Sequence, residues 1–146
     1  MKNTPDLAHS MVFAEECHRG QVDRNGIKYI LHPLQVMRRM DSETEKIVGV
    51  LHDIVEDTPI TFQDLREKGY SEEIVNAIDC LTKREGESYE DFIERCKLNP
   101  IALKVKIADL EDNMDIRRID VLTEKDMERL NKYLRAWRYL TRGEPM

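Results

Sequence analysis

Helix-start signals recur along this sequence and leave little room for any fold that is not helical. A residue able to cap a helix precedes an apolar, helix-spaced segment at Thr4, Ser42, Ser71, Ser88, Asn99 and Thr123. Proline follows two of these caps, at Pro5 and Pro100, where it suits the first helical turn. Glu45 follows Ser42 at the spacing of a capping box. Strand signals do not recur, so the sequence predicts an all-α bundle of about eight helices.

Turn signals separate the predicted helices. We expect helices over residues 6–19, 61–68, 71–82, 88–98 and 123–143, one that begins at His32, one that begins at Ser42 and ends before Pro59, and one that begins at Asn99. Residues 20–30 contain an Asn-Gly pair and predict a loop or a hairpin-like turn. Residues 83–88 predict a polar link. No repeat or second domain is indicated, so we expect a single domain over residues 1–146.

The charge balance limits the kinds of ligand that the chain binds. The formal net charge is −6, so no global basic field attracts a nucleic acid polymer. A phosphate ligand would need local Arg or Lys residues, or a metal ion. We expect neither a signal peptide nor a membrane span, because no apolar run has the required length. Cys17, Cys80 and Cys96 are odd in number and lack CxxC spacing, which predicts reduced thiols and a cytoplasmic protein.

An ionisable cluster interrupts an apolar stretch between residues 47 and 58. Its members are His52, Asp53, Glu56 and Asp57. On one helix, His52 and Glu56 would share a face, and Asp53 would lie one turn from Glu56. Burying such groups costs free energy unless something pairs with them. The cluster therefore predicts either a metal site or a solvated acidic patch.

Two further polar residues interrupt apolar segments elsewhere in the chain. His32 stands at a predicted helix start, and Asp109 interrupts the apolar run 107–110, with Asn113 one turn later. Two imidazoles and two carboxylates suit Mn²⁺, Fe²⁺ or Zn²⁺, and three segments would have to converge to provide them. A capping role for His32 and a structural hydrogen bond between Asp109 and Asn113 are the alternatives.

Three segments of the sequence resemble the conserved blocks of a known superfamily. They are HRGQVDRNGIKYILHPLQV, LHDIVEDT and VKIADLEDN, which lie in the same order and span about residues 13–113. They resemble the HD-domain phosphohydrolases, and most closely the hydrolase domain of the RelA/SpoT-type alarmone enzymes and their small stand-alone relatives. The resemblance implies a single HD-type helical domain without the synthetase domain of the larger enzymes.

The resemblance also assigns roles to matching residues. It implies that His32, His52, Asp53 and Asp109 hold one divalent metal ion, most closely Mn²⁺, with Fe²⁺, Zn²⁺ or Mg²⁺ as alternatives. It implies that Glu56 and Asp57 organise the attacking water and the proton transfers, that Arg24 contacts the nucleotide base and that Asn113 lines the substrate pocket. Apart from the resemblance, Lys28 forms a small basic group with Arg24 beside His32 and is a further candidate for substrate contact. The implied reaction removes the 3′-pyrophosphate from guanosine tetra- or pentaphosphate and releases pyrophosphate.

The sequence departs from the family pattern at a few positions. Lys28 stands where proline usually precedes the tyrosine of the first block. Glu111 and Asp112 are more acidic than their counterparts, and they would weaken anion binding if their carboxylates pointed into the pocket. Two other functions remain open: hydrolysis of another nucleotide, such as a nucleoside monophosphate or a dinucleotide cofactor phosphate, and regulatory nucleotide binding without turnover. The presence of both Glu56 and Asp57 favours an enzyme.

The last predicted helix has a stripe of apolar residues that predicts how this helix packs. Its members are Leu130, Tyr133, Leu134, Trp137 and Leu140. At this spacing they share one helix face, so they predict a core contact or the interface of a homo-oligomer. We expect no cofactor role for them.

Overall fold

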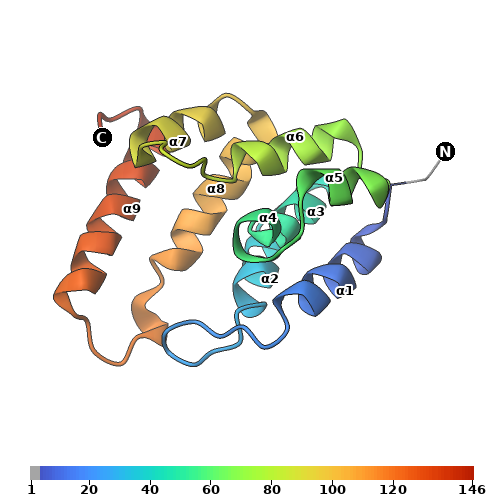
Figure 1. Cartoon of the computed structure of the whole chain (residues 1–146). Coiled ribbons are helices and arrows are strands. Elements are labelled where there is room, and N and C mark those ends of the chain that lie inside the picture. Colours follow the sequence, from blue (N-terminus) through green and yellow to red (C-terminus); the bar gives the residue numbers. More distant parts are fainter. Residues whose placement is uncertain (1–3) are drawn as a thin grey trace.

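The computed structural model describes residues 4–146, which form nine α-helices and one short 3-10 helix (Figure 1). The elements are α1 (Leu7–His18), α2 (Leu31–Arg38), α3 (Glu43–Leu51), α4 (Ile54–Asp57), α5 (Phe62–Glu67), α6 (Glu72–Cys80), α7 (Tyr89–Lys97), α8 (Pro100–Asn113), η1 (Ile116–Arg118) and α9 (Glu124–Arg142). Within the described residues, β-pairing is limited to an isolated bridge between Val22 and Lys28, in the segment expected to form a hairpin-like turn. The predicted all-α fold is confirmed.

The predicted caps explain where most helices begin. Ser42 and Thr123 both form capping boxes, and Asn99 accepts hydrogen bonds from two first-turn amides of α8. The first helix is the exception, because Asp6 rather than Thr4 caps it. The Asp6 carboxylate accepts the backbone N–H of His9 at 2.9 Å, so the helix begins two residues later than Pro5 suggested.

The helix expected to run from Ser42 to Pro59 is interrupted, which corrects the prediction of one continuous segment. Helix α3 ends at Leu51, a turn contains His52 and Asp53, and α4 begins at Ile54. Asp53 has φ −100° and ψ 2°, outside the regular helical values. The interruption lets two consecutive side chains face the same interior point, although a regular helix rotates neighbours by about 100°.

Helix α3 lies at the centre of the bundle and packs against α1, α2, α6 and α8. Its last five residues, from Ile47 to Leu51, are all buried. Gly49 allows close contact with α2, because a Cβ there would lie 3.2 Å from the Met37 Cα and 3.3 Å from its backbone nitrogen. Helices α3 and α2 are therefore held at a separation that places His32 opposite the turn after α3.

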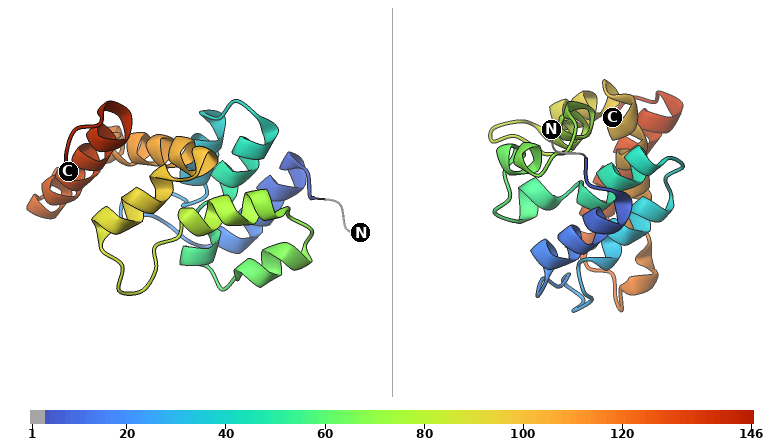
Figure 2. Two further views of the ribbon diagram at one scale, coloured as in Figure 1. Left: turned by 90° about the horizontal axis from the view of Figure 1, so that it is seen from above. Right: turned by 90° about the vertical axis from the view of Figure 1, so that its right-hand side faces the viewer.

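Helix α9 stands at the end of the bundle opposite α1 and covers α8 and α7 (Figure 2). It packs on a second apolar cluster formed around Ile93, Leu110 and Ala136. Tyr133, Trp137 and Leu140 of the predicted stripe contact this cluster, so they serve as core contacts. Between residues 4 and 146, no helix combines the length and the apolar character that crossing a membrane requires.

Arg95 of α7 ties the link at residues 83–88 to the bundle. Its guanidinium donates to both carboxylate oxygens of Glu87, at 2.6 and 2.9 Å, and to the backbone oxygens of Asp79 and Thr82, at 3.0 and 2.8 Å. The hydrogen bonds from Arg95 lower the pKa of Glu87 to about 2. This bidentate pair thus combines charge with fixed geometry.

We expect Arg95→Met to lower the free energy of unfolding by about 1–3 kcal/mol, because it leaves three acceptor groups without their donor. Urea denaturation monitored by circular dichroism measures this change. The matched control is Arg66→Met, which removes a surface pair with Glu72 and is expected to change stability by less than about 1 kcal/mol. Equal effects of the two substitutions would contradict a structural role for Arg95.

Candidate metal centre

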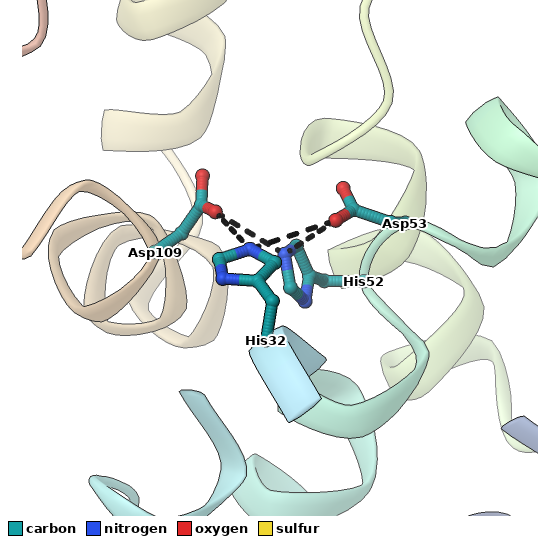
Figure 3. Close-up of side chains that lie close together, drawn as sticks. All are labelled: His32, His52, Asp53 and Asp109. Atoms are coloured by element: carbon teal, nitrogen blue, oxygen red, sulfur yellow. Dashed lines mark hydrogen bonds and ion pairs between the residues drawn. The ribbon is translucent and has the colours of Figure 1, made fainter. Parts of the chain in front are cut away.

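Four side chains from three parts of the chain meet inside the bundle (Figure 3). They are His32 in the first turn of α2, His52 and Asp53 in the turn between α3 and α4, and Asp109 on α8. Each offers one nitrogen or oxygen, and these four atoms all lie within 4.8 Å of one another. The structure therefore brings together all four residues that the sequence indicated as metal ligands, in a group that could hold a metal ion.

The donor atoms approach each other closely around a common point. The Nε2 atom of His32 lies 2.8 Å from Asp109 Oδ1 and 3.7 Å from Asp53 Oδ2. The Nε2 atom of His52 lies 3.0 Å from Asp53 Oδ2 and 3.4 Å from Asp109 Oδ1. Each imidazole thus faces both carboxylates, as the dashed lines in Figure 3 show.

The second nitrogen of each imidazole has its own partner. His52 Nδ1 lies 2.6 Å from the backbone oxygen of Gly49, and His32 Nδ1 lies 2.6 Å from Asp112 Oδ2. A carbonyl oxygen only accepts hydrogen bonds, so Nδ1 of His52 carries a hydrogen, and the ionised Asp112 imposes the same on His32. In the neutral tautomers, both Nε2 atoms then present lone pairs to the carboxylates.

Four electron-pair donors facing one point require a positive charge between them. His52 Nε2 is buried and makes no hydrogen bond of good geometry, although Asp53 lies close to it. Burying such an atom without a partner costs free energy. A divalent cation with nitrogen and oxygen ligands would satisfy all four groups at once, so the residues present fit a metal ion.

The pKa shifts of His32 and Asp53 agree with a need for positive charge between the four side chains. Burial lowers the pKa of His32, but hydrogen bonds with Asp109 and Asp112 outweigh it and raise this pKa to about 9. Burial raises the pKa of Asp53, but the charge and hydrogen bond of His52 outweigh it and lower this pKa. The carboxylates thus stay ionised and attract a cation or protons.

Three outer contacts support the four residues, and sequence reasoning missed all of them. The Tyr29 hydroxyl donates to Asp53 Oδ2 and lies 3.1 Å from Asp57 Oδ2. The buried Lys106 ammonium donates to Asp109 Oδ2 at 2.9 Å, and Asp112 accepts from His32. The sequence carried a signal for the Lys106 contact alone, because Lys106 lies three residues before Asp109 and shares a helix face with it.

The predicted catalytic residues lie beside the centre rather than within it. Glu56 and Asp57 are exposed, and the backbone N–H of Lys83 donates to Glu56 Oε1 at 3.0 Å. Partial desolvation raises the pKa of both carboxyl groups, and the negative charge of Asp53 raises them further. Raised carboxyl pKa values bring such groups toward the range in which general bases operate near neutral pH.

A cavity of about 290 Å³ adjoins the centre, and the predicted substrate residues form part of its wall. His32, Arg24, Lys28 and Asn113 line it, together with residues from η1 and α9. Arg24 forms an ion pair with the buried Asp126 near the start of α9, so its guanidinium is held in the cavity wall. Asn113 Nδ2 donates to Asp109 Oδ1 at 3.0 Å, which is the structural hydrogen bond that the sequence left as an alternative.

The two extra acidic residues on α8 are paired with neighbouring side chains. Glu111 accepts from the Trp137 indole at 3.1 Å and lies 3.5 Å from Arg39. Asp112 pairs with His32 and lies 3.2 Å from the Arg118 guanidinium. Neither residue lines the cavity, so neither opposes an anionic ligand there in the way that inward carboxylates would.

The comparisons with known sequences identify a consistent group of relatives. Over 83 residues the chain is 45% identical to a guanosine-3′,5′-bis(diphosphate) 3′-pyrophosphohydrolase of Spiroplasma citri, a match that covers 53% of this chain and 11% of that protein. It is 27% identical to the enzyme of that name from Aquifex aeolicus, over 90% of this chain and 20% of that protein. No family model matches the chain.

A bifunctional (p)ppGpp synthase/hydrolase SpoT of Escherichia coli is 31% identical over 123 residues, which cover 74% of this chain and 17% of that enzyme. The chain therefore spans only 11 to 20% of the length of these curated relatives. A solved structure described as a metazoan orthologue of SpoT that hydrolyses ppGpp superimposes with a TM-score of 0.78. That match is 20% identical and covers 94% of this chain and 85% of the other, which shows a shared fold.

The sequence matches and the fold point to the same group of proteins. The aligned parts of the relatives extend over most of this chain in two of the matches, and the shared fold covers nearly all of it. The chain is therefore related to the RelA/SpoT-type (p)ppGpp hydrolases and has their HD-type helical fold.

Proposed function

We propose that the chain is a metal-dependent hydrolase that removes the 3′-pyrophosphate of guanosine tetra- or pentaphosphate. One water is consumed, and the products are pyrophosphate and either GDP or GTP. The observation that carries the proposal is the centre of two imidazoles and two carboxylates beside a cavity lined by cationic side chains. The names of the relatives support the choice of substrate.

His32, His52, Asp53 and Asp109 would hold one divalent ion, and we favour Mn²⁺ from the family resemblance. When bound, such an ion supplies positive charge that polarises a phosphate oxygen and makes water more acidic. Glu56 and Asp57 lie beside the centre, where their carboxylates would orient the attacking water and accept its proton. The proton would then pass to the ribose 3′-oxygen as the bond to phosphorus breaks.

The cavity would bind the nucleotide. Arg24, held by Asp126, would contact the base with its guanidinium plane, and Asn113 would line the pocket. Lys28 and Arg129 also line the cavity, where their positive charges would contact phosphate. We assign the activity to the cytoplasm, which agrees with the free thiols of Cys17, Cys80 and Cys96.

A nucleotide panel tests this proposal. Purified protein with Mn²⁺ is expected to release pyrophosphate from guanosine tetraphosphate, and removal of the metal with EDTA is expected to stop the release. Ion-exchange chromatography measures the nucleotide products, and an enzymatic assay measures pyrophosphate. Phosphate release from a nucleoside monophosphate or a dinucleotide cofactor phosphate instead would assign another substrate. Tight nucleotide binding without product would indicate a regulatory module.

A further inference from the structure

Asp112 makes a contact that distinguishes His32 from His52. The Nδ1 atom of His52 meets a neutral backbone oxygen, whereas Nδ1 of His32 meets the carboxylate of Asp112 at 2.6 Å. The Asp112 side chain is only 4% exposed, and that of His32 is 11% exposed, so the pair lies largely out of water. A buried hydrogen bond between an imidazole and a carboxylate is stronger than one to a neutral acceptor.

The Asp112 carboxylate is itself held in place. Arg118 of η1 donates to Asp112 Oδ2 at 3.2 Å and also to the backbone oxygen of the same residue. Asp112 Oδ2 therefore accepts from both His32 and Arg118. The hydrogen bond from Arg118 to the Asp112 backbone oxygen also joins the end of α8 to η1. The three residues form a chain of contacts from the cavity wall, where Arg118 lies, to the Nε2 atom of His32.

We propose that Asp112 is a positioning residue that fixes the tautomer and orientation of His32 for metal binding, with Arg118 holding the Asp112 carboxylate for this task. The proposal rests on the metal-dependent function proposed above. An imidazole that donates its other N–H to a carboxylate keeps its free lone pair aimed at the metal and is a stronger ligand. Asp112 thus acts through His32 and does not touch the metal.

Glu111 offers a matched control. It precedes Asp112 on α8 and is also an acidic residue, but its carboxylate contacts Trp137 and Arg39 and faces away from the centre. A substitution there removes the same charge from the neighbouring position. It leaves the contact between His32 and its partner unchanged.

The test measures Mn²⁺ affinity directly, without substrate, by isothermal titration calorimetry on the full chain. Asp112→Ala is expected to weaken Mn²⁺ binding about 10- to 100-fold, the range seen when such outer partners are lost. Asp112→Asn keeps an oxygen that accepts from His32 but loses the charge, so we expect partial rescue relative to the alanine variant. Glu111→Gln is expected to bind Mn²⁺ like the unsubstituted chain. Circular dichroism checks that every variant is folded.

Two results separate failure of this inference from failure of the proposed function. If the unsubstituted chain binds Mn²⁺ and Asp112→Ala binds it within about twofold, the inference is overturned and the metal centre stands. If the unsubstituted chain binds no divalent metal, the proposed function fails and the inference falls with it. Variants that follow the expected order in a chain that hydrolyses no guanine polyphosphate would support the inference and contradict the proposed activity.

The role of Arg118 is tested in the same titrations. Arg118→Gln is expected to weaken Mn²⁺ binding less than Asp112→Ala, because the His32 contact remains but its acceptor is less well held. If Arg118 acts through Asp112, adding Arg118→Gln to Asp112→Ala will cause no further loss. If Arg118→Gln weakens Mn²⁺ binding as much in the Asp112→Ala background as it does alone, this part of the proposal is contradicted.

Discussion

Replacing Asp53 with alanine is expected to abolish metal binding and nucleotide hydrolysis together. The substitution removes one of two carboxylates that face the Nε2 atoms of His32 and His52, at 3.7 and 3.0 Å. A lost ligand should cost more than the roughly 10- to 100-fold effect of a lost outer partner, so we expect more than about 100-fold weaker Mn²⁺ binding. Calorimetry and a pyrophosphate release assay measure the two losses.

The control for this variant is Asp120→Ala, which removes an exposed carboxylate that belongs neither to the group of four donors nor to the cavity lining. It is expected to leave metal affinity and turnover unchanged. Asp53→Asn provides a second variant that keeps the side-chain shape if the alanine variant is poorly folded. Full activity of Asp53→Ala in the presence of EDTA would show that the metal assignment is wrong.

Replacing Glu56 with glutamine is expected to separate chemistry from metal binding. Its carboxylate lies outside the group of four donors, and glutamine keeps an oxygen that accepts the Lys83 backbone N–H. Loss of a group that moves protons lowers kcat by roughly 10²- to 10⁴-fold. We expect a fall in kcat of that order, with Mn²⁺ affinity unchanged within about threefold.

Asp57→Asn extends the same test to the neighbouring carboxylate. Asp57 contacts the Tyr29 hydroxyl, which also donates to Asp53. Asparagine keeps an oxygen near the Tyr29 hydroxyl but loses the carboxylate charge, so this variant tests whether the contact with Tyr29 is sufficient for the reaction. Metal affinity measured beside kcat distinguishes the two roles. If both Glu56→Gln and Asp57→Asn turn over at the rate of the unsubstituted chain, these residues do not handle the proton.

Local sequence signals predicted the helices well because helix ends depend on nearby residues. The caps at Ser42, Asn99 and Thr123 satisfy amides within three residues, so their chemistry is visible in the sequence. The interruption at His52 and Asp53 was not visible, because apolar residues at helical spacing lie on both sides of this pair. The helix is interrupted at the point where these two side chains contact His32 and Asp109 from other helices. Such tertiary contacts override the local helix propensity.

The members of the candidate metal centre could be predicted from their spacing and from the three matching segments, but the supporting contacts between distant parts of the chain could not. Asp112 meets His32 across 80 positions of sequence, and Tyr29 meets Asp53 across 24. No local pattern encodes such pairings, so Asp112 was expected only as a possible obstacle to anion binding. The roles of Glu56, Asp57, Arg24, Lys28 and Asn113 stay predictions.

The most direct measurement is the anomalous diffraction of crystals grown with Mn²⁺. We expect one strong manganese peak within bonding distance of Nε2 of His32 and His52 and of a carboxylate oxygen of Asp53 and Asp109. A map without a peak among these four side chains, or with the manganese bound elsewhere, would contradict the claim that two imidazoles and two carboxylates enclose one catalytic metal ion.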